Sequence, residues 1–290
     1  MRRAVDLLRL MRPHQWTKNL FVLTGLVFGH AWGDPILRRA VLTAAAAFCL
    51  VSSATYVVND VADRERDRRH PAKRLRPVAR GAVAVGGALA LAAVLAVAGM
   101  FLGALASRDV LLLLLLYAAL SVAYSFGLRR IVLLDVFVIA SGFMLRILAG
   151  TEAVGIPPSR WLLLCGLMLT LFLGFAKRRS EADWIRRGGG GDETGGGRYT
   201  VELLDGLLVI CAAGVILTYS LYTMSPDTIR THGTANLIYT VPLIVYGTFR
   251  YFFLLLDRSG GSDPARDLLR DPHLLLTGAS WLLLTLLLIR

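Results

Sequence analysis

The chain has 290 residues, of which 56% are hydrophobic and 18% are charged, and its mean hydropathy is +0.60. The apolar residues come in blocks of about 20, the length that a helix needs to cross a bilayer. This excludes an ordinary globular protein of the cytosol and a secreted disulfide scaffold. The net charge of +12 would suggest nucleic-acid binding in a soluble protein, but in a membrane protein it indicates basic cytoplasmic loops.

Nine apolar runs predict an all-α, polytopic bundle of nine transmembrane helices. The runs are rich in Leu, Ala and Val and lack the alternation of barrel strands. They cover residues 19–33, 40–58, 82–106, 110–126, 131–149, 160–176, 203–223, 236–256 and 273–290. The first run follows a long basic stretch and precedes no small-residue cleavage site, so we interpret it as a helix and not a signal peptide. We expect residues 1–290 to form one integral-membrane domain.

Lys and Arg are distributed unevenly over the connections between these runs. The N-terminal segment and the even-numbered connections are basic, whereas the odd-numbered connections hold few cations. The positive-inside rule therefore predicts that the N-terminus and the even-numbered connections are cytoplasmic in a cell membrane. Two of these connections, residues 59–81 and 177–202, are long and carry both signs of charge. They follow the second and the sixth helix, a spacing that suggests a duplicated four-helix unit.

The first connection with candidate chemistry begins with NDVADRERD, residues 59–67, which is an NDxxDxxxD pattern. At about 100° per residue, Asp60, Asp63 and Asp67 share one helical face. Three carboxylates at a membrane surface suit Mg²⁺, which takes one or two carboxylates together with water and substrate phosphates. The alternative is a solvated helix with Asp–Arg pairs at helical spacing. The cations that follow in HPAKRLRP, residues 70–77, favour a magnesium–diphosphate site.

The second candidate motif is at the cytoplasmic end of the sixth run. Lys177 and Glu181 share a helical face there, with Arg178 beside them. The alternative is simple anchoring of the helix by positive charge. The following glycine-rich residues 188–197 lack the ending of a phosphate-binding P-loop, and they predict either a flexible linker or a mobile lid.

Further candidates lie before the first run and inside the membrane. Residues 12–19, RPHQWTKN, include Lys18, which could also be an interface anchor. Ionisable residues at membrane depth are functional candidates by default. Asp135 lies near Tyr124 on the preceding connection and suits a pocket, whereas Arg146 could bind a lipid phosphate or pair structurally. Arg250 is interpreted as a structural or snorkelling residue.

At this point the residues resemble a known family. Nine helices with the sequence NDVADRERDRRHPAKRLRPVARG resemble the UbiA-type superfamily of intramembrane prenyltransferases. The opening RPHQWTKN, the HPxKRxRPxAxG continuation and AKRRSE, residues 176–181, resemble more narrowly the decaprenyl-phosphate 5-phosphoribosyltransferases. The resemblance covers nearly the whole chain. Many superfamily members have a second DxxxD where this chain has Lys177, Arg178 and Glu181, which counts against an ordinary prenyl-diphosphate donor.

The resemblance implies a Mg²⁺-dependent glycosyltransferase of cell-wall arabinan synthesis. It would transfer 5-phosphoribosyl from 5-phosphoribosyl 1-diphosphate to polyprenyl (decaprenyl) phosphate and release diphosphate. Asp60, Asp63 and Asp67 would be catalytic metal ligands. The substrate-binding residues would be Lys18, Asn59, Lys73, Arg76, Tyr124, Asp135, Arg146, Lys177, Arg178 and Glu181. Asn59 and Glu181 could bind ribose hydroxyls or metal-bound water.

The acceptor phosphate is largely ionised at pH 7, because its second pKa is about 6, so this reaction requires no strong protein base. One alternative is a prenyl-diphosphate-dependent aromatic or haem prenyltransferase, in which the same Asp residues would bind the lipid diphosphate. Another is a transporter, which would need ionisable residues at both membrane faces, whereas the carboxylates here cluster at one. We expect no nucleic-acid partner.

Overall fold

The computed structural model describes residues 2–28, 31–69, 73–156, 159–188, 196–257, 267 and 270–289. The ordered elements of this part of the chain are all helices, which confirms the all-α prediction. Seven helical segments are long and apolar enough to cross a membrane. They are α3 (Pro35–Ala62), α5 (Val85–Ala106), α6 (Arg108–Phe126), α7 (Leu134–Glu152), α8 (Arg160–Arg186), α9 (Val201–Met224) and Asn236–Asp257, which comprises η5 (Asn236–Thr240) and α11 (Val241–Asp257).

The first and last of the nine predicted spans differ from the prediction. Residues 19–33 are divided between the 3₁₀ helix η1 (Pro13–Leu23) and the short helix α2 (Thr24–Phe28). The last run forms α13 (Pro272–Leu288), which is apolar but has 17 residues. At 1.5 Å per residue it is about 25 Å long, less than the roughly 30 Å hydrocarbon core. Among the described residues, seven segments rather than nine therefore have the length and composition of a span.

Side chains on one face of η1 bind this segment to α3. Residues three apart align in such a helix, so Trp16, Asn19 and Val22 form one column. The Trp16 indole N–H donates to Ser53 Oγ at 3.0 Å, and the Asn19 amide donates to Ser52 Oγ at 3.4 Å. Val22 is fully buried. The polar groups of Trp16 and Asn19 thus have hydrogen-bond partners on α3.

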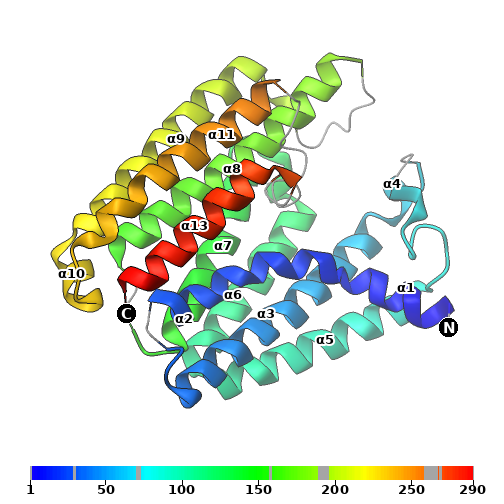
Figure 1. Ribbon diagram of the computed structural model, residues 1–290. Helices are drawn as coiled ribbons and strands as arrows, with labels where there is room; N and C mark the ends of the chain where they lie inside the picture. Colours follow the sequence, from blue (N-terminus) through cyan, green and yellow to red (C-terminus); the bar gives the residue numbers. More distant parts are fainter. Residues whose placement is uncertain are drawn as a thin grey trace. The chain divides into compact units, whose positions relative to one another are not determined.

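The chain divides into two compact units: unit 1 comprises residues 1–128 and 145–157, and unit 2 comprises residues 129–144 and 158–290. In unit 1, α3 packs along α5, and both contact α6 (Figure 1). Unit 1 also contains α1 (Arg2–Met11), α4 (Arg64–Arg69) and η2 (Lys73–Leu75). The end of α7 approaches the start of α2 so closely that a Cβ on Gly25 would lie 1.9 Å from the Gly150 carbonyl oxygen. Only glycine permits this approach.

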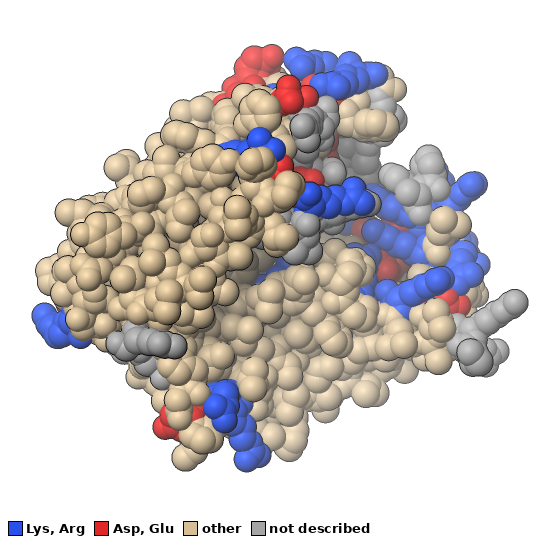
Figure 2. Space-filling view, in the orientation of Figure 1, with Lys and Arg blue, Asp and Glu red and all other residues tan. Residues whose placement is uncertain are grey.

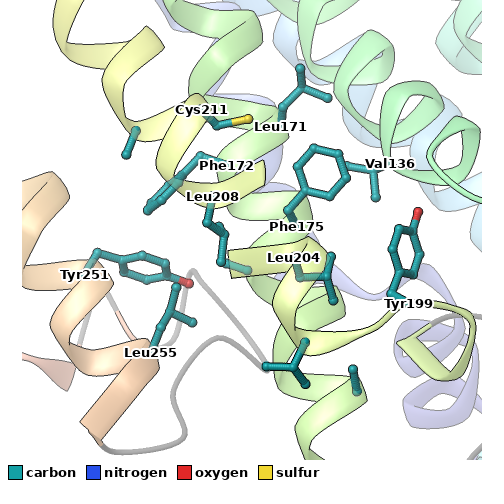
Figure 3. Packing of buried hydrophobic residues seen from close by; sticks show 14 of the residues in the cluster. Val136, Leu171, Phe172, Phe175, Tyr199, Leu204, Leu208, Cys211, Tyr251 and Leu255 are labelled. Atoms are coloured by element: carbon teal, nitrogen blue, oxygen red, sulfur yellow. The ribbon is translucent and has the colours of Figure 1, made fainter. Parts of the chain in front are cut away.

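In unit 2, α8 packs along α9, and α11 and α13 pack against each other. The core between α8, α9 and α11 is formed by apolar and aromatic side chains, including Phe172, Phe175, Leu204 and Tyr251 (Figure 3). The rings of Phe172 and Tyr251 meet edge to face, with centroids 5.7 Å apart. Short elements complete the unit: η4 (Gly196–Arg198), which precedes α9, and α10 (Pro226–His232), which follows it. The packing of this core fixes the end of α8 where the second motif lies.

An ion pair connects α11 to the start of α13 within unit 2. Arg250 Nη2 lies 2.7 Å from Asp271 Oδ2, and Asp271 also caps α13 by accepting from the Leu274 N–H at 2.9 Å. The hydrogen bond from Arg250 lowers the pKa of the Asp271 carboxyl to about 2. These contacts agree with the structural interpretation of Arg250.

The two units share one internal arrangement. In unit 1 the 28-residue helix α3 ends at Ala62, inside the first motif, and packs on α5. In unit 2 the 27-residue helix α8 ends at Arg186, just after the second motif, and packs on α9. Each unit therefore presents one charged motif at the C-terminal end of its longest helix, as the spacing of the two long connections suggests.

Candidate functional site

The carboxylates of the first motif surround the junction of two helices in unit 1. Helix α3 ends at Ala62, Asp63 caps it, and α4 starts at Arg64. Asp60, Asp63 and Asp67 are 3%, 6% and 1% exposed. The structure therefore buries all three carboxylates at a break between helices, whereas the periodicity predicts one continuous helical face. Figure 2 shows Lys and Arg side chains gathered over this part of unit 1, where α1 and α4 lie in Figure 1.

Arginines neutralise these carboxylates. Arg76 Nη1 lies 3.1 Å from Asp60 Oδ1 and 2.7 Å from Asp67 Oδ2, so one guanidinium bridges two motif residues. The Arg12 guanidinium also donates to Asp60 Oδ1. Arg66 Nη2 lies 3.0 Å from Asp63 Oδ2. Asp60, Asp67, Arg12 and Arg76 thus form one connected group, which we call the acidic cluster.

Arg12 is a member of this cluster that the candidate list from the sequence omits. Its backbone is left-handed, with φ 51° and ψ 58°, a conformation that costs a residue with a side chain about 1–2 kcal/mol. Its guanidinium also lies over the Tyr56 ring, 5.3 Å from the centroid. The contacts with Asp60 and Tyr56 offset the backbone cost. The sequence signal is Pro13, which disfavours a helical conformation at the preceding residue and so ends α1 there.

The chemistry of the acidic cluster fits a divalent cation. Asp67 Oδ1 is buried and has no hydrogen-bond partner among the described residues, and an unsatisfied buried carboxylate oxygen is costly. Asp60 and Asp67 supply the oxygen ligands that Mg²⁺ takes alongside substrate phosphates. In the described part of the chain no three His, Cys, Asp or Glu side chains converge as a ready-made metal site. Instead, Arg76 lies between the two carboxylates.

Four other predicted site residues of unit 1 are half-buried. Lys18 lies on η1, Asn59 precedes Asp60 on α3, Lys73 starts η2, and Tyr124 lies near the end of α6. Residues 70–72, between α4 and η2, lie outside the described residues. The roles of these four residues remain predictions from the sequence.

Arg146 is buried in the core of unit 1. Its Nε donates to Asn19 Oδ1 at 2.7 Å, and its Nη2 donates to the Tyr117 hydroxyl at 3.0 Å. The guanidinium also lies over the Tyr117 ring, 4.5 Å from the centroid. Arg146 therefore connects α7 to η1 and α6 through polar and cation–π contacts.

The second motif forms a buried ion-pair network in unit 2. Arg178 Nε lies 2.8 Å from Asp135 Oδ2, and Arg178 Nη1 lies 2.6 Å from Glu181 Oε2. The Arg178 and Asp135 side chains are buried, whereas the Glu181 side chain is 34% exposed and Lys177 is exposed. The structure thus pairs Glu181 with Arg178 and leaves Lys177 accessible. We call the motif cations Lys177 and Arg178, together with Asp135 and Glu181, which pair with Arg178, the basic cluster.

Tyr199 belongs to this network, although the sequence motifs do not identify it as a site residue. Its hydroxyl donates to Asp135 Oδ1 at 2.5 Å and accepts from the Leu133 N–H at 2.7 Å. Burial, together with the hydrogen bond to Asp135, raises the pKa of the Tyr199 hydroxyl, so it remains a donor at neutral pH. No local spacing relates Tyr199 to Asp135, because 64 positions separate them.

The neighbouring Arg179 has a different environment. Its Nε lies 2.5 Å from Asp205 Oδ1, and its Nη1 donates to the Leu255 carbonyl at 3.0 Å. Arg179 therefore links α8 to α9 and α11. Within the glycine-rich stretch predicted to be a linker or lid, residues 189–195 lie outside the described residues.

These features define a polytopic helical membrane protein with one acidic and one basic cluster at helix ends. The model of the UbiA prenyltransferase family matches residues 19–270. The chain belongs to this family and is a membrane-embedded transferase, as the sequence motifs predict.

Individual relatives agree with this assignment. A decaprenyl-phosphate phosphoribosyltransferase from Mycolicibacterium smegmatis is 31% identical over 95% of this chain and 90% of its own length. One from Mycobacterium tuberculosis is 32% identical over 96% of this chain and 92% of its own. The structure of a UbiA homolog from Archaeoglobus fulgidus bound to DMAPP and Mg²⁺ superimposes with a TM-score of 0.76 at 18% identity, covering 98% of this chain and 99% of that one. That likeness shows the fold.

Proposed function

We propose that this enzyme transfers 5-phosphoribosyl from 5-phosphoribosyl 1-diphosphate to polyprenyl (decaprenyl) phosphate and releases diphosphate, as a step toward cell-wall arabinan precursors. The observation that carries the proposal is the basic cluster, where Lys177 is exposed beside Arg178 and Glu181. A donor with a diphosphate and a separate 5-phosphate needs cations in addition to a metal site. The names of the relatives that match nearly the whole chain support the same reaction.

The acidic cluster would bind the leaving group. Asp60 and Asp67 would hold Mg²⁺, with Asp63 as a further ligand, and the metal would neutralise charge on the diphosphate. Arg12 and Arg76 already lie beside these carboxylates, so they can donate to phosphate oxygens there. These contacts stabilise diphosphate as the bond from ribose C1 to its oxygen breaks.

The acceptor requires placement rather than a base. As diphosphate departs, positive charge develops at C1 of the ribose, and an ionised oxygen of the lipid phosphate forms the new bond to C1. No proton has to move in this exchange. Lys177 would bind a donor phosphate, Glu181 would accept hydrogen bonds from ribose hydroxyls, and Asn59 would bind metal-bound water beside Asp60.

The remaining predicted residues would support these groups. Lys18 and Lys73 are further cations for phosphate oxygens, and Tyr124 is a further hydrogen-bonding group. Arg146 holds Asn19, the residue after Lys18, at 2.7 Å, and so can fix the position of η1. We propose that the N-terminus and both clusters are cytoplasmic, where a soluble sugar donor is accessible.

The test uses purified protein with labelled 5-phosphoribosyl 1-diphosphate and polyprenyl phosphate, with and without Mg²⁺. We expect label in the lipid fraction, dependent on Mg²⁺, and its loss in Asp60→Asn and Asp63→Asn variants that remain folded. If no label is transferred, but a prenyl diphosphate alkylates an aromatic acceptor, the protein is instead a prenyltransferase in the narrow sense.

A further inference from the structure

We propose that Tyr199 is a positioning residue for the sugar of the donor: through Asp135 and Arg178 its hydroxyl fixes the Glu181 carboxylate to accept hydrogen bonds from ribose hydroxyls. The inference rests on the proposed phosphoribosyl transfer and extends it to a residue outside both sequence motifs. In this proposal Glu181 binds the ribose. Tyr199 is the buried end of a chain of hydrogen bonds, which we call the relay, that orients Glu181.

The relay is continuous over four side chains. Tyr199 donates to Asp135 Oδ1 at 2.5 Å, and the other oxygen of Asp135 accepts from Arg178 Nε at 2.8 Å. Arg178 Nη1 then donates to Glu181 Oε2 at 2.6 Å. Both oxygens of Asp135 and two nitrogens of Arg178 are thereby used within the protein. These two residues support their neighbours, and Glu181 is the member of the relay that water can reach.

The buried end of the relay is rigid. The Tyr199 ring belongs to the apolar core of unit 2 with Val136 and Phe175 (Figure 3). Its hydroxyl also accepts the N–H of Leu133, whose φ of 69° is an outlier for a residue with a bulky side chain. The preceding Arg198 donates to the Arg130 carbonyl, so the segment before α9 holds the turn before α7 at two successive residues. Strained backbone that the surrounding structure holds in place is typical of functional sites, and here it fixes the position of the Tyr199 hydroxyl.

The chemistry of the exposed end matches a sugar hydroxyl. A carboxylate is an acceptor, and hydroxyl groups are donors, whereas donor phosphates would be repelled by Glu181. A carboxylate that is already oriented loses less conformational entropy on binding than a free side chain does. Lys177, four residues earlier on α8, is exposed and can bind a phosphate of the same donor.

The experiment measures equilibrium binding of the donor and of its 2-deoxy and 3-deoxy analogues, with Mg²⁺ and without lipid acceptor. Tyr199→Phe should weaken binding of the natural donor about tenfold, the loss expected when one hydrogen bond to a charged group is misplaced. The loss should disappear with at least one deoxy analogue. The KM for lipid phosphate should not change. Glu181→Gln should show the same selectivity.

Tyr219→Phe is the matched control. It also removes a buried hydroxyl of unit 2 with two partners, Thr240 Oγ1 and Trp281 Nε1, each at 2.7 Å. Tyr219 lies on α9, 18 residues beyond its start at Val201, which is about 27 Å along the helix. This variant should bind the donor like wild type, and similar thermal stability of the two variants would separate positioning from general destabilisation.

Each outcome bears on the inference. Unchanged donor binding in Tyr199→Phe overturns it, and so does a loss of equal size with the natural donor and both analogues. If Tyr199→Phe does not fold, Asp135→Asn breaks the next link with nearly the same shape and should give the same donor-selective loss; its absence also overturns the inference. A wild-type protein that does not bind the donor contradicts the proposed function instead.

Discussion

Arg76 occupies the position between the carboxylates where a metal would be needed, so replacing it has two opposite effects. Its guanidinium bridges Asp60 and Asp67 at 3.1 Å and 2.7 Å. Arg76→Ala leaves two buried carboxylates facing each other without this cation. We expect the variant to be less stable without Mg²⁺, to gain more stability from Mg²⁺ than wild type, and to bind the sugar donor more weakly.

The magnitude follows from these contacts. A hydrogen bond to a charged group contributes about 1.5–3 kcal/mol when buried. The Arg76 side chain is 27% exposed, so solvent screens its two bonds, and we expect a total loss of about 1–3 kcal/mol in the free energy of unfolding. Because the guanidinium no longer competes for Asp60 and Asp67, apparent Mg²⁺ affinity should increase about tenfold for each 1.4 kcal/mol removed.

The assay is thermal unfolding of the purified protein over a series of Mg²⁺ concentrations. Binding to the folded state raises stability with the logarithm of ligand concentration, so the midpoint for Mg²⁺ gives the apparent affinity. Arg64→Ala is the control, because Arg64 pairs with the exposed Glu65 at 3.8 Å and should change neither quantity. A variant at Arg76 that is as stable as wild type without Mg²⁺, with the same Mg²⁺ dependence, would refute the assignment of the metal to these carboxylates.

Three further predictions concern other groups. Lys177→Ala should raise the KM for the sugar donor about tenfold and leave the KM for lipid phosphate unchanged, because Lys177 is an exposed cation; the reverse pattern would assign it to the acceptor. The rate should increase as pH rises through about 6, with the second ionisation of the acceptor phosphate, and His70→Gln should retain this acidic limb unless a protein base operates. Asp271 has a pKa of about 2, lowered by Arg250, so their pair stabilises the protein above about pH 4 and loses this effect as pH falls toward 2. Asp271→Asn should therefore reduce thermal stability at neutral pH but not near pH 2, and parallel stability curves for the two proteins would contradict this.

The sequence predicts most of the membrane helices because length and hydropathy decide them. Helix α3 begins at Pro35, where the Asp34 side chain accepts the Ile36 N–H at 2.7 Å, and such caps are visible in the sequence. The run at 19–33 is predicted as one span, whereas its described residues are divided between η1 and α2, and the side chains of Trp16 and Asn19 bond to α3.

The sequence identifies the charged motifs but not their partners. Helical periodicity relates Lys177 to Glu181, which are four residues apart, whereas the structure pairs Glu181 with Arg178 at 2.6 Å. It cannot relate Arg12 to Asp60, 48 positions apart, because only the fold brings α1 and α3 together. Asp135 has the same limitation: its intramembrane charge marks it as a candidate, but its bond to Tyr199 depends on the packing of unit 2.

In each cluster, other residues of the unit neutralise part of the charge of the motif, and the charge of the motif is opposite in the two units. In unit 1 the motif supplies carboxylates, and arginines from other segments neutralise them. Asp67 Oδ1, buried and without a partner in the described part of the chain, favours a cation. In unit 2 the motif supplies cations, Asp135 and Glu181 neutralise Arg178, and the exposed Lys177 favours an anion. A second acidic cluster would suit a second metal on a prenyl diphosphate. A basic one suits a phosphate that carries no metal, which is what a sugar donor with a separate 5-phosphate presents. The exchange of acid for base in the second motif therefore supports the proposed phosphoribosyl donor over a prenyl diphosphate.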